Sequence, residues 1–355
     1  MSSPARSQQL GAPAAVATTA RPRLHGVDVA RGLAVVGMLL VDNRGSAAIG
    51  TQLVHAPWHG LRLADVVFPV FLLLVGVSMP FSRRADRPRA VLLRVARLAG
   101  LGLLVLTAKY GPGTWSAGVL GHVAGAYLLC WLLLRLPRRA QLPTALGVLV
   151  ALSSLSVLVP VPGVGRPALE PGASWAEWFD GLLGLGFGAE APHTLLPSAL
   201  TVYLGVLAGR VLLEHPGLPA VRRLAVAAVP LLATGLLLAP ALPLNKRLWT
   251  PSYLLVTGAL GLLVLAAAHA LVDVRGVRRP FRALEELGVN AIVAFVASEL
   301  VFRAVLSHGV QPSVVDALTQ AAGPPVAAWA WALLSVAAVW GLCAVLARRG
   351  VVVRV

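Results

Sequence analysis

The residues best suited to chemistry lie close together near the start of this sequence. The segment His55-Ala-Pro-Trp58-His59-Gly60 is preceded by Asp42-Asn43 and followed by Asp65, so two imidazoles and two carboxylates fall within 24 positions. A histidine titrates near neutral pH, so it can take a proton from an amine or hydroxyl or carry a transferred group. A neighbouring carboxylate or amide would fix its tautomer and stabilise its charge. The pattern indicates acid–base or nucleophilic chemistry.

The elements that must position these residues are apolar helices. Of the 355 residues 57% are hydrophobic and only 12% are charged, with a mean hydropathy of +0.80. A soluble domain carries roughly 25% charged residues, so this chain could not cover a surface in water. We expect an all-α, polytopic integral membrane protein. The net charge of +16 lies mostly in short gaps between apolar runs, which favours topology signals and lipid contacts over nucleic-acid binding.

Apolar runs long enough to cross a bilayer, about 20 residues each, recur at near-regular spacing. They predict about ten transmembrane helices, near 29–47, 61–81, 90–108, 116–135, 142–160, 194–213, 222–241, 250–272, 284–306 and 326–347. The expected domains are a disordered cytoplasmic tail at 1–22, one transmembrane domain at 23–347 and a cytoplasmic tail at 348–355.

The positive charges alternate from loop to loop. Of the 30 Lys and Arg residues, 23 fall in the N-terminal tail and in loops at one end of the predicted bundle. The other seven are Arg44, Arg62, Lys109, Arg166, Lys246, Arg247 and Arg303. Cytoplasmic loops carry the excess of Lys and Arg, so both termini are expected to be cytoplasmic in a multi-pass plasma-membrane protein. Within the longest outer loop, Trp175-Ala-Glu-Trp-Phe-Asp180 suggests an interfacial segment with its carboxylates in water.

The first outer loop also admits simpler interpretations. Histidine and tryptophan at the outer ends of helices could merely be solvated interfacial residues. A metal site would need ligands beyond His55 and His59, and the spacing does not suggest a zinc set. No metal is therefore expected.

Other polar groups lie within predicted spans, where an ionisable side chain costs about 2.5–3.5 kcal/mol on insertion scales. Asp28 and Arg31 are three apart, so they can form an ion pair on one helix face. Asn290 could be a hydrogen-bonding contact between helices. His122, His193 and His269 are interpreted as packing residues, and Gly102, Gly205 and Gly209 as points of close helix contact.

Several stretches together resemble the heparan-alpha-glucosaminide N-acetyltransferase family. They are Arg23-Leu-His-Gly-Val-Asp28-Val-Ala-Arg31-Gly32, then His55-Ala-Pro-Trp58-His59-Gly60-Leu-Arg-Leu-Ala-Asp65 with Phe68-Pro69, then Leu196 to Gly209, and Pro243-Leu-Asn245-Lys246-Arg247-Leu-Trp249. The likeness runs in the family's order over most of residues 23–300. The His-Ala-Pro-Trp-His-Gly block is its most specific part.

The resemblance implies an acyltransferase that moves an acyl group, typically acetyl from acetyl-CoA, to an amino sugar across the membrane. The family's active-site histidine falls on His55 and its loop asparagine on Asp42. Asp65, Asp42 and Asn43 are the expected catalytic neighbours of His55. The expected substrate-binding residues are Trp58, His59, Asn245, Lys246 and Asn290. Arg31, Arg94 and Arg97 are expected to hold the CoA phosphates, because arginine pairs well with phosphate.

Two mechanisms stay open: His55 either carries the acyl group or acts as general base in a ternary complex. The sequence is also similar to bacterial relatives of this family, so the acceptor is expected to be an amino sugar or a cell-envelope glycan. Membrane lipids and a second copy of the chain, as a homodimer, are the other expected partners. The alternative function is a multi-pass transporter or flippase, which would explain intramembrane polar groups as a substrate path.

Overall fold

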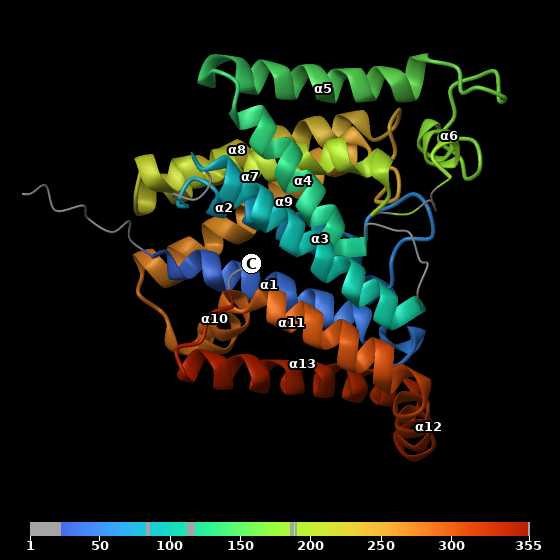
Figure 1. The fold of residues 1–355 in the computed structure, drawn as a ribbon, viewed down its shortest axis with the longest axis vertical. Coiled ribbons are helices and arrows are strands. Elements are labelled where there is room, and N and C mark those ends of the chain that lie inside the picture. The colour runs from blue at the N-terminus through green and yellow to red at the C-terminus, as the bar shows by residue number, and fades with distance from the viewer. Residues whose placement is uncertain (1–22, 83–85, 112–117, 185–187, 189, 354–355) are drawn as a thin grey trace, which may run out of the picture.

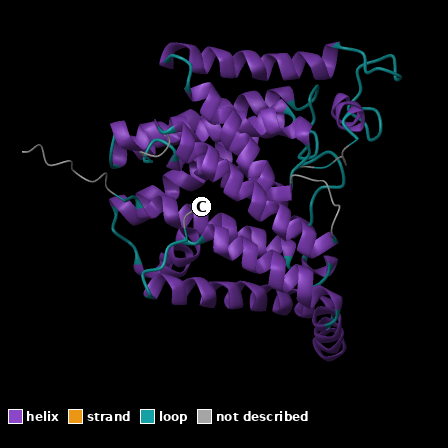
Figure 2. Ribbon diagram, viewed as in Figure 1, coloured by secondary structure: helices purple, strands orange, loops and turns teal. Residues whose placement is uncertain are grey.

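The computed structural model of the protein describes residues 23–82, 86–111, 118–184, 188 and 190–353. The regular structure of this part of the chain is helical, which confirms the predicted fold class (Figure 2). The predicted tail at 1–22 lies outside the described residues, as do Arg354 and Val355.

Seven helical stretches among the described residues are long and apolar enough to cross a membrane. They are α3 (Pro88–Tyr110), α5 (Arg138–Leu158), Pro192–Glu214 with α7 (Leu195–Glu214), α8 (Leu218–Leu238), Pro251–Val274 with α9 (Pro251–Ala268), Ala291–His308 with α11 (Ala291–Ala297), and α13 (Pro324–Arg348). The chain is therefore a membrane protein by the length and composition of its helices.

The other three predicted spans correspond to shorter or more polar helices. These are α1 (His25–Asp42), α2 (Leu63–Ser78) and α4 (Gly118–Leu134). Two further helices had no predicted counterpart, namely α6 (Trp175–Leu182) and α12 (Val310–Ala322). Each predicted segment thus has a helical counterpart, seven of the described stretches have the length and composition of a span, and the total of about ten stays a prediction.

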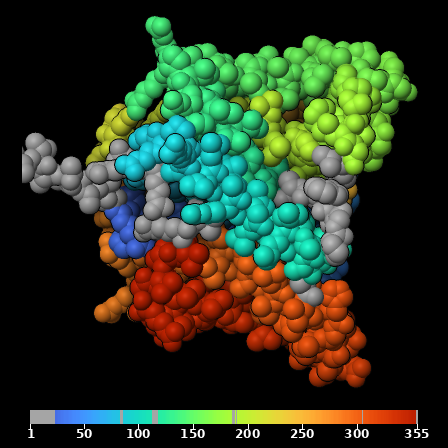
Figure 3. All heavy atoms as spheres, viewed as in Figure 1, coloured from blue at the N-terminus to red at the C-terminus, as the bar shows by residue number. Residues whose placement is uncertain are grey.

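The helices form a bundle in which α1, α2, α7 and α9 pack at the centre. Figures 1 and 3 place α5 at one edge and α12 and α13 at the opposite edge. Leu72, Leu73 and Leu74 of α2 are fully buried, as is Tyr253 of α9. In contrast, α5 exposes Leu142, Leu146 and Val150, as expected for a helix that faces lipid.

The loops gather at two ends of the bundle. Among the described residues, the Arg-rich end holds the loops around 79–82 and 86–87, 135–137, 215–217 and 275–281. The His55 end holds those at 43–62, 159–184, 190–191, 239–250 and 306–309 (Figure 1). At the His55 end the amide of Gly60 donates to Leu244 O at 2.7 Å and the Trp58 indole donates to Leu169 O at 2.8 Å. The sorting of loops agrees with the alternation expected from the charges.

Two boundaries differ from the prediction for physical reasons. Helix α1 begins at His25, not 29, because the Asp273 carboxylate accepts from the main-chain N–H groups of His25 and Gly26, at 2.9 and 3.0 Å. A distant side chain thus satisfies donors that a helix start leaves open. The predicted span 284–306 is interrupted at Asn290, which separates α10 (Arg282–Val289) from α11.

Glycines allow the central helices to touch backbone to backbone. A Cβ at Gly205 of α7 would lie 1.9 Å from the Leu73 carbonyl oxygen of α2, and one at Gly209 would lie 2.5 Å from Val77 O. The prediction of close contact at these two positions is confirmed. The same holds between α1 and α10, where a Cβ at Gly32 would lie 1.8 Å from Leu284 O.

Gly205→Ala is expected to destabilise the protein by about 1–3 kcal/mol or more, because α2 and α7 must separate to admit the methyl group. Gly100→Ala is the matched control, since a Cβ there meets no atom within 4 Å and alanine favours a helix. Thermal unfolding in detergent should show a large drop for Gly205→Ala and no drop for Gly100→Ala. Equal melting temperatures would contradict the packing.

Candidate active site

His55 is fixed by a carboxylate from the first turn of α2. The Asp65 side chain is 1% exposed, and its Oδ1 lies 2.8 Å from His55 Nδ1. Its Oδ2 accepts from the main-chain N–H groups of Ala56 and Arg62, both at 3.1 Å. One carboxylate therefore folds the 54–62 loop over the helix start and orients the histidine in it.

The pairing sets the chemistry of the imidazole. An ionised carboxylate only accepts hydrogen bonds, so Nδ1 carries the proton and Nε2 of neutral His55 keeps its lone pair. The Tyr253 hydroxyl of α9 donates to the Asp65 carbonyl oxygen at 2.6 Å and anchors this turn in the core. His55 is thereby a positioned base or nucleophile, with its side chain 41% exposed.

A second segment, between α8 and α9, brings a lysine to the same histidine. Lys246 Nζ lies 3.4 Å from His55 Nε2 and 3.5 Å from Nδ1, which places the ammonium beside the ring and not in line with either nitrogen. The turn is held by Asn245 Oδ1, which accepts from Leu248 N at 2.9 Å, and by Thr250 Oγ1, which accepts from Asn245 N at 3.1 Å. Trp249 adopts φ 49°, which is uncommon for a bulky residue.

Burial lowers the pKa of Lys246 below its ordinary value of 10.5, although Glu190, Asp65 and Asp42 act in the opposite direction. Lys246 therefore keeps its ammonium proton to a higher pH in the unfolded chain than in the folded chain. The contribution of Lys246 to stability is least favourable at neutral pH and improves as pH rises through the window up to 10.5.

Lys246→Met is expected to melt at a higher temperature than the wild type at pH 7 while losing activity. The gap in melting temperature should shrink as pH is raised towards 10, because wild-type Lys246 then loses its buried charge. Arg247→Met is the control, as Arg247 is exposed on the same turn. A gap that grows with pH would contradict the assigned direction.

These side chains line a small chamber of about 90 Å³ at the His55 end of the bundle. Its polar lining residues are Asp42, His55, Glu190 and Lys246, and the rest of the wall is apolar. Asp42 is paired with Arg303, whose Nη1 lies 3.4 Å from Asp42 Oδ1. Asn43 instead points away, with its amide nitrogen donating to Ser298 Oγ at 2.7 Å. Of these two expected neighbours of His55, Asp42 faces the chamber. Asn43 instead connects the end of α1 to the helix that follows α11, at Ser298–Val305.

The predicted substrate-binding residues separate into two groups. Lys246 lines the chamber. Trp58 donates to Leu169 O, and Asn245 Nδ2 donates to His59 Nδ1 at 3.2 Å, so these residues tie the loops of the His55 end together. Burial lowers the pKa of His59, which suits its role as an acceptor in the neutral form.

Asn290 lies near the Arg-rich end and binds the end of the described chain. Its amide nitrogen donates to Val351 O at 3.3 Å, and its oxygen accepts from Val353 N at 3.1 Å. The side chain is fully buried. Asn290, which was expected to bind substrate, lines neither the chamber at His55 nor the arginine-lined cavity, and it instead connects the helix break to the segment after α13.

Sequence reasoning missed a histidine–aspartate pair that supports the lysine turn. Asp180 Oδ2 lies 2.6 Å from His193 Nδ1, and His193 Nε2 lies 2.7 Å from Arg247 O. Asp180 is 0% exposed, so the expectation that the carboxylates of this segment stand in water is wrong for Asp180. His193 is also more than a packing residue. The amphipathic spacing of α6 could have indicated that Asp180 is buried. It could not have indicated the partner of Asp180, because His193 belongs to another segment.

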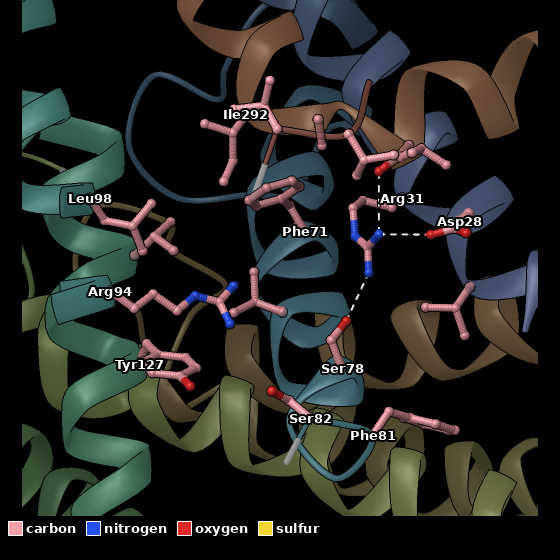
Figure 4. A pocket seen from close by; sticks show the side chains of 18 of the residues that line it. Asp28, Arg31, Phe71, Ser78, Phe81, Ser82, Arg94, Leu98, Tyr127 and Ile292 are labelled. Carbon is pink, nitrogen blue, oxygen red and sulfur yellow. Dashed lines mark hydrogen bonds and ion pairs between the residues drawn. The ribbon is translucent and has the colours of Figure 1, made fainter. Parts of the chain in front are cut away.

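A second, larger cavity opens towards the Arg-rich end (Figure 4). Its volume is about 1000 Å³, and among the described residues five arginines and one carboxylate, Asp28, line it. The arginines are Arg23, Arg31, Arg87, Arg94 and Arg97. The cavity is therefore suited to a large anionic molecule.

The arginines of this cavity are not equivalent. Arg31 donates to Asp28 Oδ1 at 2.9 Å, Ser78 Oγ at 2.7 Å and Gly288 O at 3.2 Å, which confirms the expected ion pair and joins three helices. The Arg94 guanidinium stands 4.7 Å above the Tyr127 ring, and its buried Nε has no hydrogen-bond partner among the described residues. Arg94 is therefore better placed than Arg31 to bind an anion.

The two cavities meet inside the bundle. Phe71, Leu120, Ala291 and Ile292 line both of them. The described part of the chain has no group of three or more His, Cys, Asp or Glu side chains that could hold a metal ion. The arginine-lined cavity and the chamber at the His55–Asp65 pair therefore lie on the two sides of one shared wall.

One protein family matches this chain over more than half of its length. The family described as "Heparan-alpha-glucosaminide N-acetyltransferase, catalytic" matches residues 23–243, which include His55, Asp65 and the arginines of α3. The chain belongs to this family. It is thus a member of a membrane acetyltransferase family, and the resemblance predicted from the sequence is confirmed.

Two curated members of the family align with most of this chain. Human heparan-alpha-glucosaminide N-acetyltransferase is 25% identical over 79% of this chain and 53% of its own length. The mouse protein of the same name is 25% identical over 84% of this chain and 57% of its own length. The chain spans about half the length of the curated relatives it matches.

Proposed function

We propose that this protein transfers an acyl group from acyl-CoA, bound at the Arg-rich end, to an amino or hydroxyl group of a glycan at the His55 end. The observation that carries the proposal is a pair of cavities with a shared wall, one lined by arginines and the other by a carboxylate-oriented histidine. The positive-inside rule favours a cytoplasmic Arg-rich end. The donor would then come from the cytoplasm and the acceptor from outside.

The donor cavity suits CoA in size and charge. CoA carries several phosphate charges, and arginine forms strong charge-assisted hydrogen bonds with phosphate oxygens. Arg94 and Arg97 follow each other on one face of α3, at an i,i+3 spacing that keeps neighbours together. The apolar junction would accept the thioester end but disfavours the charged nucleotide, which stays in the large cavity.

The reacting atom is His55 Nε2. It either attacks the thioester carbonyl carbon, with CoA leaving as the thiolate, or removes the proton of the acceptor's amine or hydroxyl as that group attacks. In both routes Asp65 holds Nδ1 and stabilises the positive ring. Lys246 is placed to stabilise the oxyanion that forms on the thioester carbonyl.

Turnover of acetyl-CoA by detergent-purified protein tests the proposal, against a panel of amino sugars and envelope oligosaccharides. We expect release of CoA that depends on an acceptor. Incubation with radiolabelled acetyl-CoA and no acceptor separates the two routes, because only the first leaves label on the protein. A folded protein that neither binds nor consumes acyl-CoA, yet moves a glycan into proteoliposomes, would establish the transporter instead.

Arg94→Gln is expected to weaken CoA binding by about 10-fold or more, because hydrogen bonds to charged groups contribute roughly 1.5–3 kcal/mol. Arg89→Gln is the matched control, since Arg89 is exposed one turn earlier on α3. Equilibrium binding of radiolabelled CoA measures both. Equal affinity in the two variants would remove Arg94 from the donor site.

A further inference from the structure

The junction between the two cavities is narrow and apolar. Phe71 of α2 and Ile292 of α11 line both cavities, and Figure 4 shows them above Arg94 and Tyr127. Leu120 and Ala291 complete the shared wall. These four side chains separate the arginine-lined cavity from the chamber at His55.

Beyond the junction the space is small. The chamber at His55 holds about 90 Å³, whereas the cavity before it holds about 1000 Å³. About 10–15 Å³ of such volume is needed for one water molecule, so the chamber has room for roughly six to nine heavy atoms, which the thioester carbonyl, the acyl chain and the attacking group of the acceptor must share. Met38, Val67, Phe68, Val119 and Phe295 form much of its wall.

The helices around the chamber cannot move apart easily. A Cβ at Gly76 of α2 would lie 1.9 Å from Val202 O of α7, and one at Gly288 of α10 would lie 1.8 Å from Asp28 O of α1. The main chains of α1 and α2, which line the chamber, are therefore already in contact with those of α10 and α7. Because a close-packed interior resists expansion, the side chains at the junction set the size of the chamber.

We infer that Phe71 is the residue that restricts the donor to short acyl groups, of about two or three carbons, by closing the wall between the donor cavity and the His55 chamber. The inference rests on the proposed function and adds its specificity. Phe71 has the largest side chain in the shared wall. A longer acyl chain would have to fold back against this ring before its carbonyl carbon reached Nε2.

The test compares acetyl-, butanoyl- and hexanoyl-CoA as donors for the wild type, Phe71→Ala and Phe71→Leu. We expect the wild type to lose roughly 10-fold or more in kcat/KM for each methylene that does not fit. Phe71→Ala should raise the ratio of hexanoyl to acetyl transfer by at least about 10-fold, with Phe71→Leu intermediate. Phe302→Ala is the control, because Phe302 packs on Trp331 away from both cavities and its ratio should equal that of the wild type.

Binding of radiolabelled CoA without an acyl group accompanies each assay, so that two failures can be told apart. CoA binding and acetyl transfer with an unchanged chain-length profile in both Phe71 variants would overturn the role of Phe71 alone. Equal use of hexanoyl-CoA by the wild type would do the same. A folded wild type that binds no CoA and transfers no acetyl group would overturn the proposed function together with this inference. If Phe71→Ala does not fold, Phe71→Leu and Ile292→Ala carry the comparison.

Discussion

His55→Ala is expected to reduce acyl transfer by about 10²–10⁴-fold, the range that a positioned base contributes. Once His55 Nδ1 is bonded to Asp65, Nε2 is the ring nitrogen that remains to react. Neither the acyl-carrier route nor the general-base route has another group at that position. CoA binding should change little, because the arginine cavity lies at the other end of the bundle. The measurement is kcat with acetyl-CoA, beside CoA affinity and melting temperature.

A control variant separates a chemical role of His55 from a structural one. His308→Ala removes an exposed imidazole at the same end of the molecule and should leave kcat, affinity and stability unchanged. If His55→Ala retains wild-type kcat while it is folded, His55 is not the reacting residue. If acetyl label appears on the wild type but not on His55→Ala, the acyl-carrier route is established.

Asp65→Asn is expected to lower kcat by on the order of 10²–10⁴-fold with a smaller effect on folding. The amide oxygen can still accept from the Ala56 and Arg62 N–H groups. The amide nitrogen then faces His55 Nδ1 and donates to it, which moves the ring proton to Nε2. The histidine would stay in place, but its reacting nitrogen would no longer have a lone pair.

Asp65→Ala distinguishes this tautomer effect from loss of structure. It leaves two main-chain donors without their acceptor, so it should cost about 1–3 kcal/mol of stability per buried unsatisfied donor in addition to activity. Asp316→Asn, at an exposed carboxylate of α12, is the neutral reference. If Asp65→Asn is fully active, the orientation of His55 by Asp65 has no part in the reaction.

The chain's local patterns indicated much of the architecture. Apolar run length is a property of consecutive residues, so all ten expected helices have counterparts, and the Arg-rich gaps lie together at one end. The His55 block and Asp65 are only ten positions apart, close enough for one loop and one helix turn to bring them together. The Asp28–Arg31 pair follows directly from helical spacing.

Packing between distant segments decided the rest. Lys246 is 191 positions from His55, and Asp180 supports its turn only because His193 bridges to Arg247. Asp42 and Asn43 are adjacent in sequence, yet the rotation of α1 against its neighbours directs one to the chamber and the other to Ser298. Composition and periodicity describe which face of a helix is apolar. They do not contain the register at which two helices meet, and that register places Phe71 between the arginines and His55.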